Sequence, residues 1–259
     1  MKQLSAPFLE IGLYSHDQSG EESIMTLFDF IATPGPSRLY EVRLLQGDDM
    51  KRHKFASIND RVSKEVRCVS YSDVKQVHSD RDAIILQITM PTRDKWPAGD
   101  AMIITQNSIS QQASKNDNHP ISVLFSGDML SRPALNINKP LKHLAESALF
   151  AFKEIIEILK PEYASITVDY NLESPYDLLL DGRTLAFRDC YVSKRVLGKV
   201  MTANIIDKYG VYHENALNGT VFISSPWLLP LENKDNIKCD YYSMSVDIGQ
   251  QIAEYFRKS

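Results

Sequence analysis

PLKHLAESALFAFKEIIEILK, residues 140–160, is the stretch that decides the fold of this chain. Its apolar side chains recur at steps of three and four residues, which places them on one face of an α-helix. They are Leu141, Leu144, Ala145, Ala148, Phe152, Ile155 and Leu159. Pro140 suits a first helical turn, and Lys160-Pro161 ends the helix. At roughly 1.5 Å per residue the helix spans about 30 Å, which predicts a core helix that crosses a whole domain.

Short apolar and β-branched runs on both sides of this helix predict strands. The expected strands are 8–14, 39–45, 83–90, 102–105, 121–125, 163–168, 185–192, 211–214 and 220–224. The first of them alternates poorly, which is typical of a strand covered on both faces. Asn218-Gly219 predicts a hairpin between the last two. The basic run 51–54 follows Asp48 and Asp49, and it reads as a solvated turn.

Three further helices are expected around the long one. One lies between Glu21 and Ile31, one begins at Ser193 and ends near Tyr209 before Gly210, and an amphipathic one runs from Ser245 to Lys258. These elements predict an α+β protein, with mixed or mainly antiparallel sheets packed by a long central helix and a C-terminal helix.

A domain boundary is expected at residues 131–139, a polar stretch between two prolines. The predicted organisation is an N-terminal α+β half, 1–135, and a C-terminal α+β half, 136–259. One continuous domain is the alternative, since a chain of 259 residues can form either.

The composition limits the class of protein. Hydrophobic residues make up 43% and charged residues 24% of the chain, as in ordinary globular proteins. A net charge of −4 disfavours nucleic acid as a partner. Cys68, Cys190 and Cys239 are scattered, which indicates neither a disulfide framework nor a zinc site. The sequence shows no signal-peptide core and no run of the ~20 apolar residues that span a bilayer. We therefore predict a cytoplasmic protein without a cofactor and without a membrane partner.

The densest polar cluster lies after the strand at 163–168. Its carboxylates are Asp169, Glu173, Asp177, Asp181 and Asp189. Such groups can divide acid and base work or hold a hard cation, but their spacing matches neither a calcium loop nor a glycosidase. The plainer interpretation is a solvated loop with Asp/Arg pairs. We predict no catalytic and no metal-binding residue here, and we interpret these carboxylates as an acidic, partner-binding loop.

Two other candidates are Cys190 and Trp227. Cys190 would need a base to act as a nucleophile, and His213 is the candidate, although a lone cysteine is usually a buried small side chain. Trp227, in Ser225-Pro226-Trp227-Leu228, either caps the local core or anchors an interface, and we include it among the partner-binding residues.

The second half carries a series of short patterns. After the long helix come residues 161–166, Glu173-x-Pro175, Asp189-x-Tyr191-Val192-Ser193, residues 218–225 and a closing helix. In this order they resemble the immunity proteins of bacterial polymorphic toxin systems, which are cytoplasmic antidotes to contact-dependent or type VI-delivered toxins. The resemblance covers residues 140–258 and implies a non-enzymatic binder that occludes a cognate toxin, with no catalytic residues. Mild acidity fits a basic toxin such as a nuclease.

Two alternatives remain open. A hydrolase or transferase would be built on the acidic segment between Asp169 and Asp189. A structural component of a phage or secretion assembly would form oligomers that grow with concentration.

Overall fold

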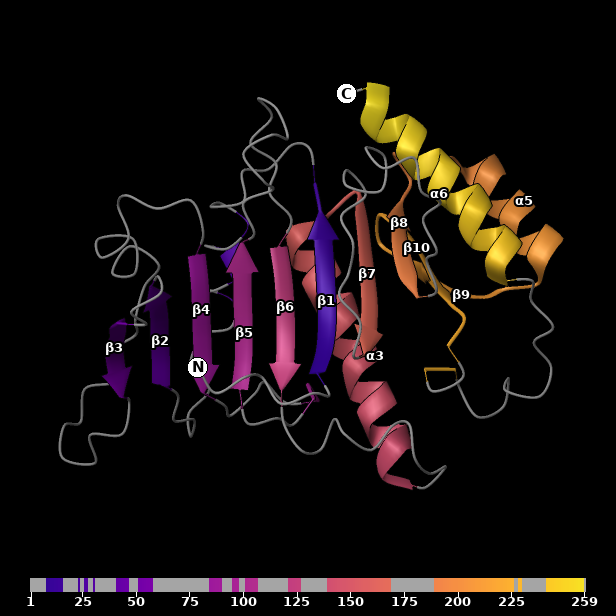
Figure 1. Ribbon diagram of the computed structural model, residues 1–259. Helices are drawn as coiled ribbons and strands as arrows, with labels where there is room; N and C mark the ends of the chain where they lie inside the picture. The colour runs from indigo at the N-terminus through magenta and orange to yellow at the C-terminus, as the bar shows by residue number, and fades with distance from the viewer. Residues whose placement is uncertain are drawn as a thin grey trace.

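The computed structural model describes residues 8–15, 23, 26, 27, 30, 41–46, 51–57, 84–89, 95–97, 101–106, 121–126, 139–168, 189–225, 228–229 and 241–258. Its strands are β1 (Phe8–Tyr14), β2 (Glu41–Gln46), β3 (Lys51–Ser57), β4 (Ile84–Thr89), β5 (Ala101–Gln106), β6 (Ile121–Ser126), β7 (Tyr163–Val168), β8 (Cys190–Ser193), β9 (Tyr212–Ala216) and β10 (Gly219–Ile223). They form a 10-stranded sheet in the order β3-β2-β4-β5-β6-β1-β7-β8-β10-β9 (Figure 1). Every pairing is antiparallel, so the predicted α+β class is confirmed.

Helices lie on both faces of one part of the sheet, around β1, β7, β8 and β10. α3 (Lys139–Leu159) lies behind the strands in Figure 1, whereas α5 (Lys199–Tyr209) and α6 (Tyr241–Lys258) lie on the opposite face. The predicted stripe of α3 is confirmed by the burial of Ala145, Ala148, Phe152, Ile155 and Leu159. None of the described helices combines the length and the apolar character that crossing a bilayer requires.

Strands β8 and β10 are buried along their whole length because both of their faces are covered. Tyr191 and Val221 pack in the core beneath α3. Cys190 and Phe222, one position away on each strand, pack beneath α5 and α6. Side chains alternate between the two faces of a strand, so a strand with two covered faces shows a continuous apolar run.

Strand β1 joins the two halves of the chain. It pairs with β6 on one side and with β7 on the other. The hydrogen-bonded sheet thus continues across the boundary predicted at residues 131–139. Leu9, Ile11 and Leu13 lie in the core beneath α3, and the residues from Leu9 to Tyr14 are all buried. The expectation that this strand is covered on both faces is confirmed.

The prediction of a solvated turn at residues 51–54 was wrong. These residues belong to β3, where Lys51, Arg52, His53 and Lys54 pair with β2. β3 is the last strand at its end of the sheet. Charged side chains on an edge strand discourage pairing with another chain, so a polar run can form a strand at this position without apolar alternation.

Helix α5 begins later than predicted. Ser193 is the last residue of β8, and its carbonyl accepts hydrogen bonds from the backbone of Val196 and Leu197 in a turn. The predicted end is confirmed, because Gly210 follows Tyr209 with a φ of 58° and caps the helix. Helix α6 begins at Tyr241 rather than at Ser245.

The predicted hairpin is confirmed, with its turn one residue earlier. Leu217 and Asn218 form the turn, and Gly219 is already paired with Ala216 in the strands. A Cβ at Gly219 would lie 2.3 Å from the carbonyl oxygen of Val192. Glycine is required here by the close approach of β8, and not by a left-handed turn.

Candidate functional site

Asp189 is the one predicted partner-binding residue that lies within the described part of the chain. Asp169, Glu173, Asp177, Asp181 and Trp227 lie outside it. Asp189 directly precedes β8, and 4% of its surface is exposed. Its Oδ1 accepts hydrogen bonds from the backbone N–H groups of Ser224, at 2.8 Å, and Ser225, at 2.9 Å. This carboxylate joins β8 to the chain that leaves β10. Partner binding by the acidic segment stays a prediction.

Cys190 and His213 are separated by a strand. Cys190 pairs with Phe222, and Phe222 pairs with His213 on its other side. Two strand spacings amount to about 9–10 Å, beyond the reach of a hydrogen bond. Burial raises the pKa of the Cys190 thiol, and the neighbouring Asp189 carboxylate raises it further. The geometry therefore supports the interpretation of Cys190 as a buried small side chain.

A polar cluster lies where β7 begins and β8 ends. Glu162, just before β7, is 2% exposed. The Nη1 of Arg195 donates to its Oε1 at 3.3 Å, while the Arg195 side chain remains 63% exposed. Burial raises the pKa of Tyr191 to about 12, and the Glu162 carboxylate contributes to this rise. A buried carboxylate is thus neutralised by a cation at the surface. Removal of the Arg195 charge would leave the buried Glu162 without this ion pair.

The ring of Tyr191 points toward this cluster. Its Cε2 atom lies 2.5 Å from where a Cβ on Gly219 would be, so the ring extends along the sheet over that glycine. Among the described residues, the hydroxyl groups of Tyr191 and Ser193 are buried without a hydrogen-bond partner. The sequence gives no signal for this cluster, because pairing of β7, β8 and β10 brings its members together. Arg195 cannot give up a proton, so its contact with Glu162 is an ion pair.

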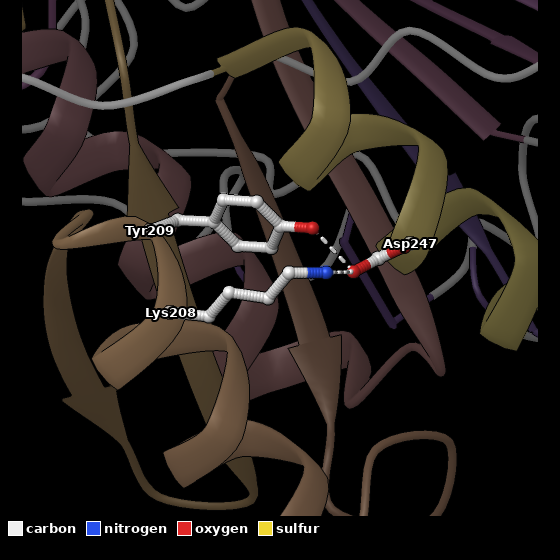
Figure 2. A network of polar contacts seen from close by, with 3 residues as sticks. All are labelled: Lys208, Tyr209 and Asp247. Carbon is white, nitrogen blue, oxygen red and sulfur yellow. Dashed lines mark hydrogen bonds and ion pairs between the residues drawn. The ribbon is translucent and has the colours of Figure 1, made fainter.

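Helices α5 and α6 are joined by a polar contact on the opposite face (Figure 2). Lys208 Nζ donates to Asp247 Oδ2 at 2.8 Å, and the Tyr209 hydroxyl donates to the same oxygen. The Lys208 ammonium also lies 4.7 Å from the centre of the Tyr209 ring. The hydrogen bonds from Lys208 and then Tyr209 lower the pKa of Asp247. This contact fixes the two helices against each other.

A second ion pair attaches edge strand β9 to α3. Lys153 pairs with Glu214, and the Tyr212 hydroxyl donates to Glu214 Oε1 at 3.1 Å. Burial lowers the pKa of Lys153, against an opposing effect of Glu157. Within the described ranges, no three His, Cys, Asp or Glu side chains gather where they could hold a metal ion.

Comparison with known proteins shows a distant structural likeness. No protein-family model matches the chain. No curated protein matches it either. Among solved structures, it is similar to the Pseudomonas aeruginosa T6SS protein PA0821, with a TM-score of 0.46 and 14% identity over 95% of this chain and 73% of that one. This likeness is distant in sequence and in structure, and it says nothing about what this chain does.

Proposed function

We propose that this protein is a non-enzymatic binding protein that neutralises a cognate bacterial toxin in the cytoplasm by direct contact. The proposal starts from the resemblance of residues 140–258 to the immunity proteins of polymorphic toxin systems. The observation that best supports its non-enzymatic character is the position of Asp189. Its carboxylate is buried and bound by two backbone N–H groups of its own chain.

A hydrolase or transferase would use these groups differently. A general acid or base must reach the substrate proton, within about 2.6–3.2 Å or through one water. Asp189 is buried in a contact with Ser224. Cys190 is buried, and strand β10 lies between it and His213. These positions favour a scaffold over a catalytic role for the described members of the two candidate sites.

The architecture of the resembling region also suits a binder. Helices α3, α5 and α6 cover both faces of β7, β8 and β10, so turns at the ends of these strands are held on a packed core. A preorganised surface loses less entropy when it binds than a flexible one does. Turns on such a core are therefore well placed to meet a partner.

The test is co-expression with the protein encoded immediately upstream. We expect a stable complex after affinity purification and size-exclusion chromatography, and we expect growth to be restored in cells that produce the upstream protein. A toxin from an unrelated system is the control, and growth should not be restored against it. If the upstream protein is toxic and this protein neither binds it nor restores growth, the proposal fails.

A further inference from the structure

Three separate segments meet at one end of the sheet. β7 begins where β8 ends, since Tyr163 pairs with Val192, and β10 begins at the same level, since Gly219 pairs with Ser193. Residues 160–162, 194–199 and 217–218 therefore lie together beyond these strand ends. We call this surface the basic end.

Hydrogen bonds fix the parts of the basic end to one another. The backbone N–H of Lys194 donates to the carbonyl of Asn218 at 2.8 Å. The Nζ of Lys194 donates to the carbonyl of Leu217 at 3.0 Å. The N–H of Leu197 donates to the carbonyl of Ser193 at 3.0 Å and closes the turn before α5. The β8–α5 turn and the hairpin tip thus form one ordered surface.

The basic end is positively charged on a chain that is negative as a whole. Its exposed cations are Lys160, Lys194, Arg195 and Lys199. Its carboxylate, Glu162, is 2% exposed and is paired with Arg195. Four cations stand against one buried anion, while the net charge of the chain is −4. Such a concentration of one sign favours approach by an acidic surface.

Leu217 lies next to Lys194 on the basic end. It is 70% exposed, and it is the one exposed large hydrophobic residue among the side chains whose burial the structure describes. It stands at the tip of a hairpin whose β10 strand is buried along its length. Its backbone carbonyl accepts a hydrogen bond from Lys194 Nζ, so the tip of the hairpin is tied to the β8–α5 turn. An exposed leucine on a surface that also carries cations provides the apolar and the polar parts of a protein–protein contact.

We propose that the basic end is the surface that recognises the toxin, and that the toxin presents acidic side chains around an apolar pocket that receives Leu217. The inference rests on the proposed function and names its binding surface. It places recognition apart from the acidic segment, and it calls for an acidic contact surface on the toxin. A protein fits better than nucleic acid or a membrane. The segments contain no aromatic residue on which a base would stack, and they form no amphipathic helix that would lie in a bilayer.

The test is calorimetric titration of the protein encoded immediately upstream with variants of the full chain. We expect Leu217→Asp to weaken binding about tenfold or more, because burial of the leucine is lost and a like charge is introduced. We expect Lys199→Glu to weaken binding about tenfold, mainly through slower association at low salt. A glutamate suits the first turn of α5, so the fold should be retained. Lys199→Arg keeps the charge and should bind as the unaltered chain does, and Gln250→Asp, exposed on α6, is the matched surface control.

The outcomes separate the two proposals. If the unaltered chain does not bind the upstream protein, both fall. If the unaltered chain binds and the variants Leu217→Asp and Lys199→Glu bind equally well, the basic end is not the binding surface. The proposed function then stands. If Asp169→Asn and Asp177→Asn weaken binding while Leu217→Asp does not, recognition belongs to the acidic segment. Binding of the chain to a 20-base-pair duplex or to phosphatidylglycerol vesicles, lost in Leu217→Asp, would overturn the choice of a protein partner. Equal melting temperatures establish that the variants are folded.

Discussion

The Oδ1 atom of Asp189 lies 2.8 Å from the backbone nitrogen of Ser224, whose N–H it accepts, across 35 positions of the chain. The next N–H, that of Ser225, donates to the same oxygen at 2.9 Å. A carboxylate that accepts two backbone N–H groups forms stronger hydrogen bonds than a neutral acceptor does. Asp189, the last carboxylate of the acidic segment, therefore holds the end of β10 to the start of β8.

Asp189→Ala should lower the free energy of unfolding by about 2–3 kcal/mol, because the buried N–H of Ser224 loses its acceptor. Asp189→Asn keeps an oxygen acceptor, so its free energy of unfolding should fall by less. Urea denaturation of the two variants measures both values. Equal stabilities of the alanine variant and the unaltered protein would show that these hydrogen bonds do not hold the fold.

Gly219→Ala should be strongly destabilising, because the new Cβ would meet the Val192 carbonyl oxygen at 2.3 Å and the Tyr191 ring at 2.5 Å. Overpacking of this kind costs about 1–3 kcal/mol, and more where backbone must move. Gly198→Ala is the control, since nothing lies within 4 Å of its Cβ. We expect thermal melting to separate the two variants, and equal melting temperatures would contradict the close approach of β8 to β10.

Tyr191→Phe should leave the stability at pH 7 unchanged or raise it, because the hydroxyl is buried without a partner among the described residues. Tyr209→Phe is the matched control. It removes the hydrogen bond to Asp247 and should cost about 1 kcal/mol. Unfolding free energies of the two variants at pH 7 provide the comparison.

Comparison of the unaltered protein with Tyr191→Phe should also show a dependence of stability on pH. Burial raises the pKa of Tyr191 from 10.0 to about 12, so the folded state favours the neutral phenol. The resulting stability is fully present below pH 10 and is lost as the pH rises toward 12. The unaltered protein should therefore lose more stability between these values than Tyr191→Phe does. Parallel curves for the two proteins would contradict a buried Tyr191.

Cys190 should resist alkylation in the folded protein. It is fully buried, and burial raises the pKa of its thiol, so little thiolate is available to react. We expect iodoacetamide at pH 8 to label the Cys190 peptide only in urea, as read by mass spectrometry, and we expect His213→Ala to make no difference. Rapid labelling of the folded protein that slows in His213→Ala would support Cys190 as a nucleophile with His213 as its base.

Much of the fold was predictable because its signals are local. The apolar stripe of α3 follows from steps of three and four residues, and the predicted strand 163–168 matches β7. β3 was missed because an edge strand of basic residues shows no apolar alternation. The sequence predicts that Ser193 begins a helix, because pairing with β10, which places Ser193 in a strand, is not a local property.

The functional surfaces were less predictable because they depend on pairing between distant segments. The acidic neighbours of Asp189 indicate a partner-binding loop, yet its Oδ1 accepts hydrogen bonds from Ser224 and Ser225. Asn218-Gly219 indicated a hairpin correctly, but the need for glycine comes from Tyr191 on β8. The basic end unites three segments whose charges are unremarkable in the sequence.

Titration of this protein into the purified protein encoded immediately upstream, with the activity of that protein followed in parallel, tests most directly whether the chain is a toxin-neutralising binder. We predict a saturable complex of fixed stoichiometry, with toxin activity lost in proportion to the complex formed. Undiminished toxin activity, with no heat of binding, would contradict the proposed function.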